Sequence, residues 1–193
     1  KPDLYGVGCG LQSANGFAFP FPVGSACGVS ARNACATSYA TPHVAAAAAL
    51  VRQYYSEGWY PNGTRQLHNA FIPSGALLKA TLVNATIDMT DPTFAAGYPG
   101  PLEGWGLIRL DDALFFDADA RNLQIWDYRN ADGLYTGESK THQIEIVTAT
   151  EPLKVTLVWT EPPAVAGAAA PVINDLNLIV TSPDGTQTFL GNN

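Results

Sequence analysis

The sequence predicts helices joined by Gly- and Pro-rich loops over residues 1–119, followed by an antiparallel β sandwich or barrel over residues 120–193. The change of hydrophobic period indicates this division. The period is that of helices before Asp117-Ala118-Asp119 and becomes two after it. The length of 193 residues suffices for one large domain or two small ones.

Three helices are predicted before the boundary. The strongest covers residues 37–55, where five consecutive alanines favour a helix with a small face. Pro42 falls in its first turns, where the early N–H donors lack intrahelical partners and a missing N–H costs little. Ser74 is placed to cap a second helix over residues 76–83, and a third short helix is expected at about residues 109–115.

Alternating apolar residues predict strands after the boundary. The clearest alternation lies at Leu153–Leu157 and Leu176–Val180, and further strands are expected around Leu123, Ile125, Ile144 and Ile146. The turn sequence Ser182-Pro183-Asp184-Gly185 reverses the chain into residues 187–190. Roughly five strands fit, against the ~7–8 of a complete sandwich or jelly roll, so the β domain is expected to be incomplete in this chain.

Composition and charge argue against two classes of partner. The net charge of −7 leaves no basic stripe for nucleic acid, and the longest apolar run, Val44–Val51, is far shorter than the ~20 residues that cross a bilayer. We therefore expect neither a nucleic-acid nor a membrane partner. Charged residues make up 14% of the chain, with 18 Gly and 14 Pro, which is typical of the surface of secreted enzymes and predicts an extracellular location.

The three cysteines, Cys9, Cys27 and Cys35, cannot all pair within the chain. Cys27 and Cys35 are spaced to close a small surface loop in an oxidising compartment. The alternative is that the cysteines are small buried thiols. No Cys/His spacing of a zinc site occurs.

Ser38 stands at the start of the strongest helix, where it has two alternative roles. A hydroxyl there lies at the positive end of the helix, and the residue's own N–H is free, so an oxyanion formed beside it is stabilised by both. Acyl transfer requires this arrangement. The alternative is that Ser38 or Thr37 merely caps the helix.

The segment Ala36-Thr37-Ser38-Tyr39-Ala40-Thr41-Pro42-His43-Val44-Ala45 resembles the nucleophile motif of the subtilisin-like serine peptidases, in which Ser38 aligns with the nucleophile. Lys1-Pro2-Asp3-Leu4 resembles the segment that leads into the strand before that serine, and Gly104-Trp105-Gly106-Leu107-Ile108 resembles the closing turn. The resemblance implies an α/β subtilisin-like catalytic domain, of which residues 1–119 are the C-terminal part.

Residues 120–193 resemble the start of the jelly-roll domain that follows the catalytic domain in one branch of these peptidases, and also the P-domain of the proprotein convertases. The matching segments are Leu153–Trp159, Asn174–Leu178 and Ser182–Thr186. The resemblance therefore covers nearly the whole chain.

Two residues depart from the usual motif. Ala36 replaces a Gly, and Tyr39 replaces the usual Met beside the nucleophile. The resemblance places Thr37 and Tyr39 beside the oxyanion and the leaving group, where the Tyr39 ring narrows the cleft. The alternative for Tyr39 is a packing substitution without kinetic effect.

The rest of the catalytic triad is expected outside this chain. In the family the acid and the base precede the serine, and so does the amide that completes the oxyanion hole. An upstream segment of the same or another chain is therefore expected to supply Asp and His, and this chain alone should be nearly inert. His43 is rejected as the base because it follows Ser38 by five residues on the same helix, and His68 and His142 are interpreted as solvated or packed.

The resemblance implies a secreted serine endopeptidase that acts on protein or peptide substrates through an acyl-enzyme on Ser38. The alternative function is a catalytically inactive binding or structural module that uses the β domain. The chemistry requires no cofactor. The resemblance allows structural calcium, for which Asp175 in Asn174-Asp175-x-Asn177 is the candidate ligand; the alternative for Asp175 is a turn or strand-end carboxylate.

Asn62-Gly63-Thr64 and Asn84-Ala85-Thr86 satisfy the glycosylation tripeptide. Asn62 lies in a Pro/Gly loop and is expected to be the more accessible of the two.

Overall fold

The computed structural model describes residues 3–10, 12–15, 28–31, 35–89, 99–148 and 150–191. The chain forms two compact units, Lys1–Leu50 with Thr86–Arg109 and Val51–Ala85 with Leu110–Asn193. The predicted domain boundary near residue 119 stays a prediction. Among the described residues no helix has the length and apolar character needed to cross a bilayer.

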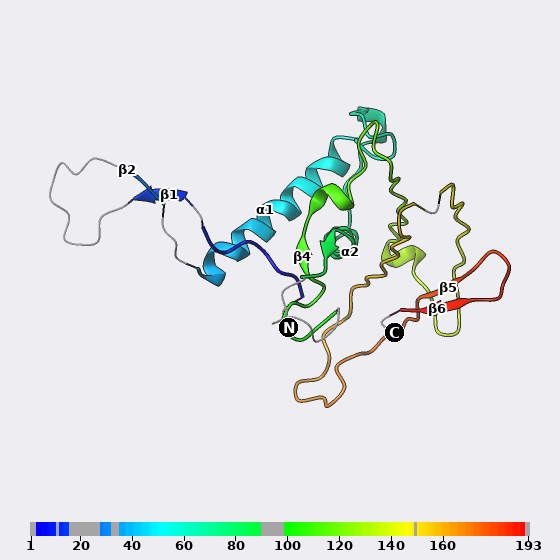
Figure 1. Ribbon diagram of the computed structural model, residues 1–193. Helices are drawn as coiled ribbons and strands as arrows, with labels where there is room; N and C mark the ends of the chain where they lie inside the picture. The colour runs from blue at the N-terminus through cyan, green and yellow to red at the C-terminus, as the bar shows by residue number, and fades with distance from the viewer. Residues whose placement is uncertain are drawn as a thin grey trace. The chain divides into compact units, whose positions relative to one another are not determined.

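Helix α1 (Thr37–Ser56) is the longest of the described elements and confirms the helix predicted at residues 37–55 (Figure 1). Pro42 lies inside it, also as predicted. Pro42 is the sixth residue of the helix, beyond the first turn, whose N–H groups are unpaired in any helix. An N–H at this position would bond to the Ser38 carbonyl, and proline has none. The Ser38 carbonyl therefore lacks its usual intrahelical partner.

Helix α2 (Gly75–Asn84) begins as the sequence predicts. Ser74 has an extended backbone, and its Oγ accepts a hydrogen bond from the Leu77 N–H at 3.0 Å. A cap of this kind contributes about 1 kcal/mol to stability. The predicted capping by Ser74 is confirmed.

The third predicted helix, at residues 109–115, is wrong. The structure has a short 3-10 helix there, η3 (Leu110–Asp112). The Ala113 and Leu114 N–H groups both bond to the Leu110 carbonyl, so the turn tightens instead of propagating. The nearby Ala118 adopts a φ of +78°, which is incompatible with a right-handed helix.

Tyr54 and Tyr55, at the end of α1, form the centre of an aromatic core in the second unit. Tyr55 is fully buried, and its ring contacts the rings of Tyr54, Tyr60 and Phe71. Its hydroxyl lies 3.0 Å from Oγ1 of Thr81. Burial raises the pKa of Tyr55, and it also raises the pKa of Tyr54 to about 12.

Within the first unit, the segment of residues 5–8, which contains Gly6 and Gly8, packs against the first half of α1. Tyr5 exchanges backbone hydrogen bonds with Gly106 and Ile108, at 2.8 and 3.2 Å, so the segment lies along strand β4 (Leu107–Ile108). β4 in turn pairs antiparallel with β3 (Thr86–Ile87). On its other side the segment lies close to the start of α1: a Cβ on Gly6 would be 2.9 Å from the Ala40 carbonyl oxygen, and one on Gly8 would be 2.8 Å from that of Ala36, just before the helix.

The described residues after 119 form one hairpin, and no jelly roll is seen among them. β5 (Ile179–Thr181) pairs antiparallel with β6 (Thr188–Leu190), so the predicted chain reversal is confirmed, but the strand expected at Leu176–Val180 begins only at Ile179. The turn between them is also as predicted, because Gly185 has a φ of +71° and donates to the Ser182 carbonyl at 2.9 Å. A jelly roll in residues 120–193 stays a prediction.

The strands predicted around residues 123–125, 144–146 and 153–157 are wrong. These segments have no described strand beside them to complete a ladder, and an alternating pattern without a partner does not make a strand. 3-10 helices η1 (Leu67–Asn69) and η4 (Asn130–Asp132) lie in the second unit. The remaining sheet pairs β1 (Gln12–Asn15) with β2 (Gly28–Ala31).

Candidate active site

Ser38 is the second residue of α1 and is exposed to solvent. Its N–H lies in the first turn, where a helix provides no intrahelical acceptor. The first backbone carbonyl before the helix, that of Ala36, accepts from the N–H groups of Tyr39 and Ala40, at 3.1 and 3.3 Å, and not from the N–H of Ser38. Within the described part of the chain no backbone acceptor takes the Ser38 N–H, so this donor and the positive end of the helix lie beside an accessible hydroxyl, which is the arrangement that stabilises an oxyanion.

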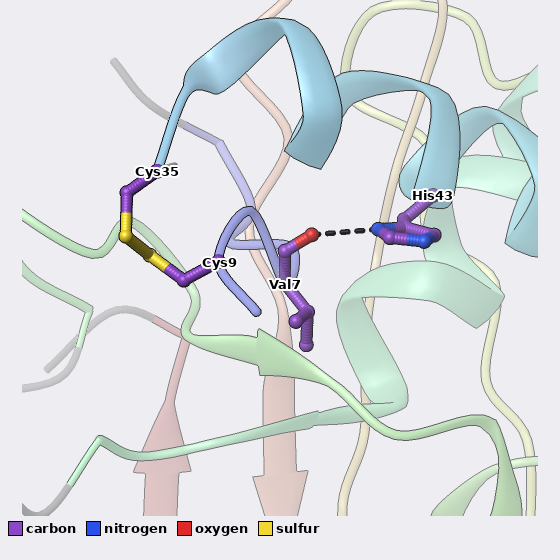
Figure 2. The surroundings of a disulfide bond; sticks show 4 residues. All are labelled: Val7, Cys9, Cys35 and His43. Carbon is purple, nitrogen blue, oxygen red and sulfur yellow. Dashed lines mark hydrogen bonds between the residues drawn. A yellow bond between two sulfur atoms is a disulfide. The ribbon is translucent and has the colours of Figure 1, made fainter. Parts of the chain in front are cut away.

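Three contacts fix the start of α1 to the preceding segment, and two of them are drawn in Figure 2. Cys9 and Cys35 form a disulfide bond, and the His43 Nδ1 donates to the Val7 carbonyl at 2.6 Å. The third is a backbone hydrogen bond of 3.1 Å from the Ala36 N–H to the Gly8 carbonyl. Together they hold the helix on either side of Ser38.

The disulfide corrects the sequence-based expectation for the cysteines. Cys35 is bonded to Cys9 and so is not available to Cys27, which lies outside the described residues. The alternative of buried thiols is also wrong for this pair, because Cys9 and Cys35 are both exposed. Sequence spacing favoured the short loop, but strand and helix packing brings the more distant partner to a Cα separation of 4.3 Å.

The histidines of the chain are engaged elsewhere or exposed. Because a carbonyl can only accept, the Nδ1 of His43 carries the proton in its hydrogen bond to Val7. Five helical residues also turn His43 about 140° away from Ser38. His142 stacks on Trp126 with ring centroids 4.2 Å apart, and His68 is exposed in η1. Within the described residues no histidine is hydrogen-bonded to Ser38.

Thr37 and Tyr39 flank Ser38 at the start of α1, as the sequence predicts. The Thr37 carbonyl accepts from Thr41 Oγ1 at 2.9 Å, and Tyr39 is 36% exposed. Both residues are therefore accessible from solvent next to Ser38. Their roles beside the oxyanion and the leaving group stay predictions.

Asp175 is exposed, and its neighbour Asn174 is engaged elsewhere. The Nδ2 of Asn174 donates to a carboxylate oxygen of Glu161 at 3.0 Å. The described residues contain no group of three or more His, Cys, Asp or Glu that could hold a metal. Since calcium takes ~6–8 oxygen ligands, the side chains described around Asp175 do not by themselves fit a calcium site. Calcium at Asp175 stays a prediction.

Sequence reasoning missed the positioning roles of Val7, Gly8 and Cys9. The Gly6-Val7-Gly8 spacing was the available signal, because two glycines separated by one residue allow a backbone to approach another element closely. It also missed Glu103, which is 1% exposed and accepts from the Met89 N–H at 3.0 Å through Oε2. No pattern in the sequence distinguishes this glutamate from a surface one.

Residues 23–106 match the subtilase family. The match includes the segment of α1 that carries Ser38 and ends at Gly106, which bonds to Tyr5. No solved structure matches the chain.

Curated relatives include three Dictyostelium discoideum proteins named serine protease/ABC transporter B family protein. The proteins tagB and tagD are 26% identical to this chain over 81% of its length. The protein tagA is 29% identical over the whole chain. The chain spans only about a tenth of these relatives, 10% of tagB and tagD and 11% of tagA.

Proposed function

We propose that this chain is the nucleophile-bearing part of a subtilisin-like serine endopeptidase. The observation that carries the proposal is Ser38, exposed at the start of α1 with a first-turn N–H beside it, inside the segment that matches the subtilase family. The names of the three relatives support the same activity. The substrates are proteins or peptides.

In this proposal the Ser38 hydroxyl attacks the carbonyl carbon of the scissile peptide bond. The Ser38 N–H and the positive end of α1 stabilise the oxyanion of the tetrahedral intermediate. Its collapse expels the amine and leaves an acyl-enzyme, which water then hydrolyses. Thr37 and Tyr39 border the oxyanion and the leaving group.

A base must take the proton of the Ser38 hydroxyl, and the described histidines do not contact it. We therefore propose that the Asp and His of the triad come from residues outside these 193, in the same or another chain. Loss of the base costs about 10⁴-fold or more in rate, because the hydroxyl is then no longer activated. This chain alone is accordingly expected to be inactive.

The proposal includes an extracellular location, which the exposed Cys9–Cys35 disulfide supports, since such bonds persist in oxidising compartments. It also includes a jelly-roll fold for residues 120–193, supported by the β5–β6 hairpin. That domain would stabilise the catalytic domain or restrict access to its cleft.

A second candidate function is a binding or structural module without catalysis. The observation that favours it is an apolar pocket in the second unit, lined by Leu153, Val155, Leu178, Val180, Phe189, Leu190 and Gly191. Peptidase activity at Ser38 decides between the two.

A fluorophosphonate probe tests the proposal on the full-length protein. We expect the probe to label wild type and not Ser38→Ala, and we expect the variant to lose peptide hydrolysis. Ser56→Ala is the matched control, because Ser56 lies at the other end of α1, where its Oγ makes one long hydrogen bond among the described residues, 3.4 Å to the Gln53 carbonyl. An unlabelled wild-type protein, or hydrolysis that survives Ser38→Ala, would refute the enzyme function.

A further inference from the structure

The two Asn-x-Thr tripeptides have opposite surroundings in the structure. Asn62 and Thr64 are both exposed. The Nδ2 of Asn62 donates one hydrogen to Gln66 Oε1 at 3.0 Å, and no acceptor among the described residues takes the other. A substituent on this nitrogen therefore extends into solvent.

The middle residue of the first tripeptide holds the turn in place. Gly63 is buried with a φ of +70°, donates to the Trp59 carbonyl at 2.8 Å and accepts from the Asp117 N–H at 3.2 Å. A Cβ at Gly63 would lie 2.4 Å from the Asp117 nitrogen, so the backbone is packed at this residue. The backbone of the turn is thus fixed through Gly63, while the side chains on either side are exposed and hydrogen-bond to Gln66, Asn62 as the donor and Thr64 Oγ1 as the acceptor at 3.3 Å.

The side-chain nitrogen of Asn84, at the end of α2, hydrogen-bonds to the segment of residues 154–156. Its Nδ2 donates to the Lys154 carbonyl at 3.3 Å and to Thr156 Oγ1 at 3.0 Å, so both hydrogens have acceptors. The two residues that complete this tripeptide, Ala85 and Thr86, are each 0% exposed. A sugar on Asn84 would remove one donor and place a bulky polar group at the contact with residues 154–156.

The disulfide provides a second, independent observation. Cys9 and Cys35 are bonded although both are exposed, as in proteins that mature in an oxidising secretory compartment. In eukaryotes N-glycosylation takes place along the same route, on exposed Asn-x-Ser/Thr tripeptides.

We infer that Asn62 is an N-glycosylation site and that Asn84 is unmodified. The donor is a lipid-linked oligosaccharide diphosphate, used by an oligosaccharyltransferase. A bond forms between Asn62 Nδ2 and the anomeric carbon of the first sugar, while the bond from that carbon to the phosphate oxygen breaks. The nitrogen loses one proton, and the lipid diphosphate leaves. This inference goes beyond the proposed peptidase function and does not depend on it.

The test is peptide mapping of the full-length protein secreted by a eukaryotic host, with and without peptide N-glycosidase. We expect glycan on the peptide that contains Asn62, conversion of Asn62 to aspartate by the glycosidase, and an unmodified Asn84. Absence of glycan from Asn62, or glycan on Asn84, would overturn the inference. The wild-type map decides this even where a variant folds poorly.

Variants give a second readout as a shift in gel mobility. Asn62→Gln and Thr64→Ala should each abolish the shift produced by the glycosidase, whereas Thr64→Ser should retain it because the hydroxyl remains. Asn84→Gln is the matched control and should leave the shift unchanged. A shift that persists in Asn62→Gln would contradict the assignment.

Discussion

Replacing Cys9 and Cys35 together by serine should destabilise the protein and slow the reaction of Ser38. The two cysteines are 26 residues apart in the sequence. In the loop-entropy description, a cross-link that closes a loop of this length contributes about 3.5 kcal/mol by restricting the unfolded chain. With a urea dependence of ~1–3 kcal/mol per molar, the unfolding midpoint should fall by about 1.2–3.5 M.

The reaction of Ser38 should respond as well, because the disulfide joins the chain three residues before it to the segment beside α1. The His43–Val7 and Ala36–Gly8 hydrogen bonds remain in the double variant, so we expect slower labelling and not complete loss. A displacement of about 1 Å at a reacting group can cost ~100-fold, which sets the upper limit of the effect.

The assay is urea unfolding of the full-length protein, followed by the initial rate of fluorophosphonate labelling in buffer. Cys27→Ser is the matched control, since Cys27 is not part of the Cys9–Cys35 bond and its removal should leave both quantities unchanged. If the double variant keeps the wild-type midpoint and labelling rate, the disulfide neither stabilises the fold nor positions Ser38.

Three further predictions follow from the packing and the turn. Gly8→Ala should lower the free energy of unfolding in urea by about 1–3 kcal/mol, because the new Cβ would be 2.8 Å from a backbone oxygen. In the control Gly75→Ala the new Cβ meets nothing within 4 Å, so the change should be neutral or stabilising. Thr81→Val should cost about 1–3 kcal/mol in the same measurement by leaving the buried Tyr55 hydroxyl without its partner. Hydrogen bonds from Ser182 and from Thr186 lower the pKa of Asp184 to about 2. The stability that the ionised carboxylate gives the turn should therefore be complete above about pH 4 and lost toward pH 2. NMR of the hairpin amides can follow this loss.

Each of these predictions has an outcome that contradicts it. Equal midpoints for Gly8→Ala and Gly75→Ala would show that the segment moves away from α1 without cost. Adding Tyr55→Phe to Thr81→Val should recover part of the loss, and strict additivity would contradict the hydrogen bond. A hairpin whose amide shifts stay constant between pH 4 and pH 2 would contradict the role of Asp184.

The elements that the sequence predicted correctly depend on local interactions. The alanine run makes α1 a helix through propensity, Ser74 caps α2 through a residue three positions away, and the Pro183–Gly185 turn needs only its own backbone angles. The place of Ser38 at a helix start also follows from the residues around it, whereas its role as the nucleophile comes from the resemblance of residues 36–45 to the family motif and stays a prediction.

The elements that were wrong depend on partners far away in the sequence. Alternation at Leu153–Leu157 predicts a strand only when a neighbouring strand completes the ladder, and the described residues place none there. The pairing of Cys9 with Cys35 required knowing that the segment before Cys9 lies between β4 and α1. The buried tyrosine core likewise arises from tertiary packing, which an amphipathic pattern does not specify.

The Cys9–Cys35 bond also keeps the chain covalently connected if a peptide bond between the two cysteines is cut. A cut at any peptide bond between residues 9 and 35 would leave the two pieces joined through sulfur. The piece that carries Ser38 would thus keep its covalent link to the segment that supports it. Such a nicked molecule would migrate as one band without reductant and as two bands with it.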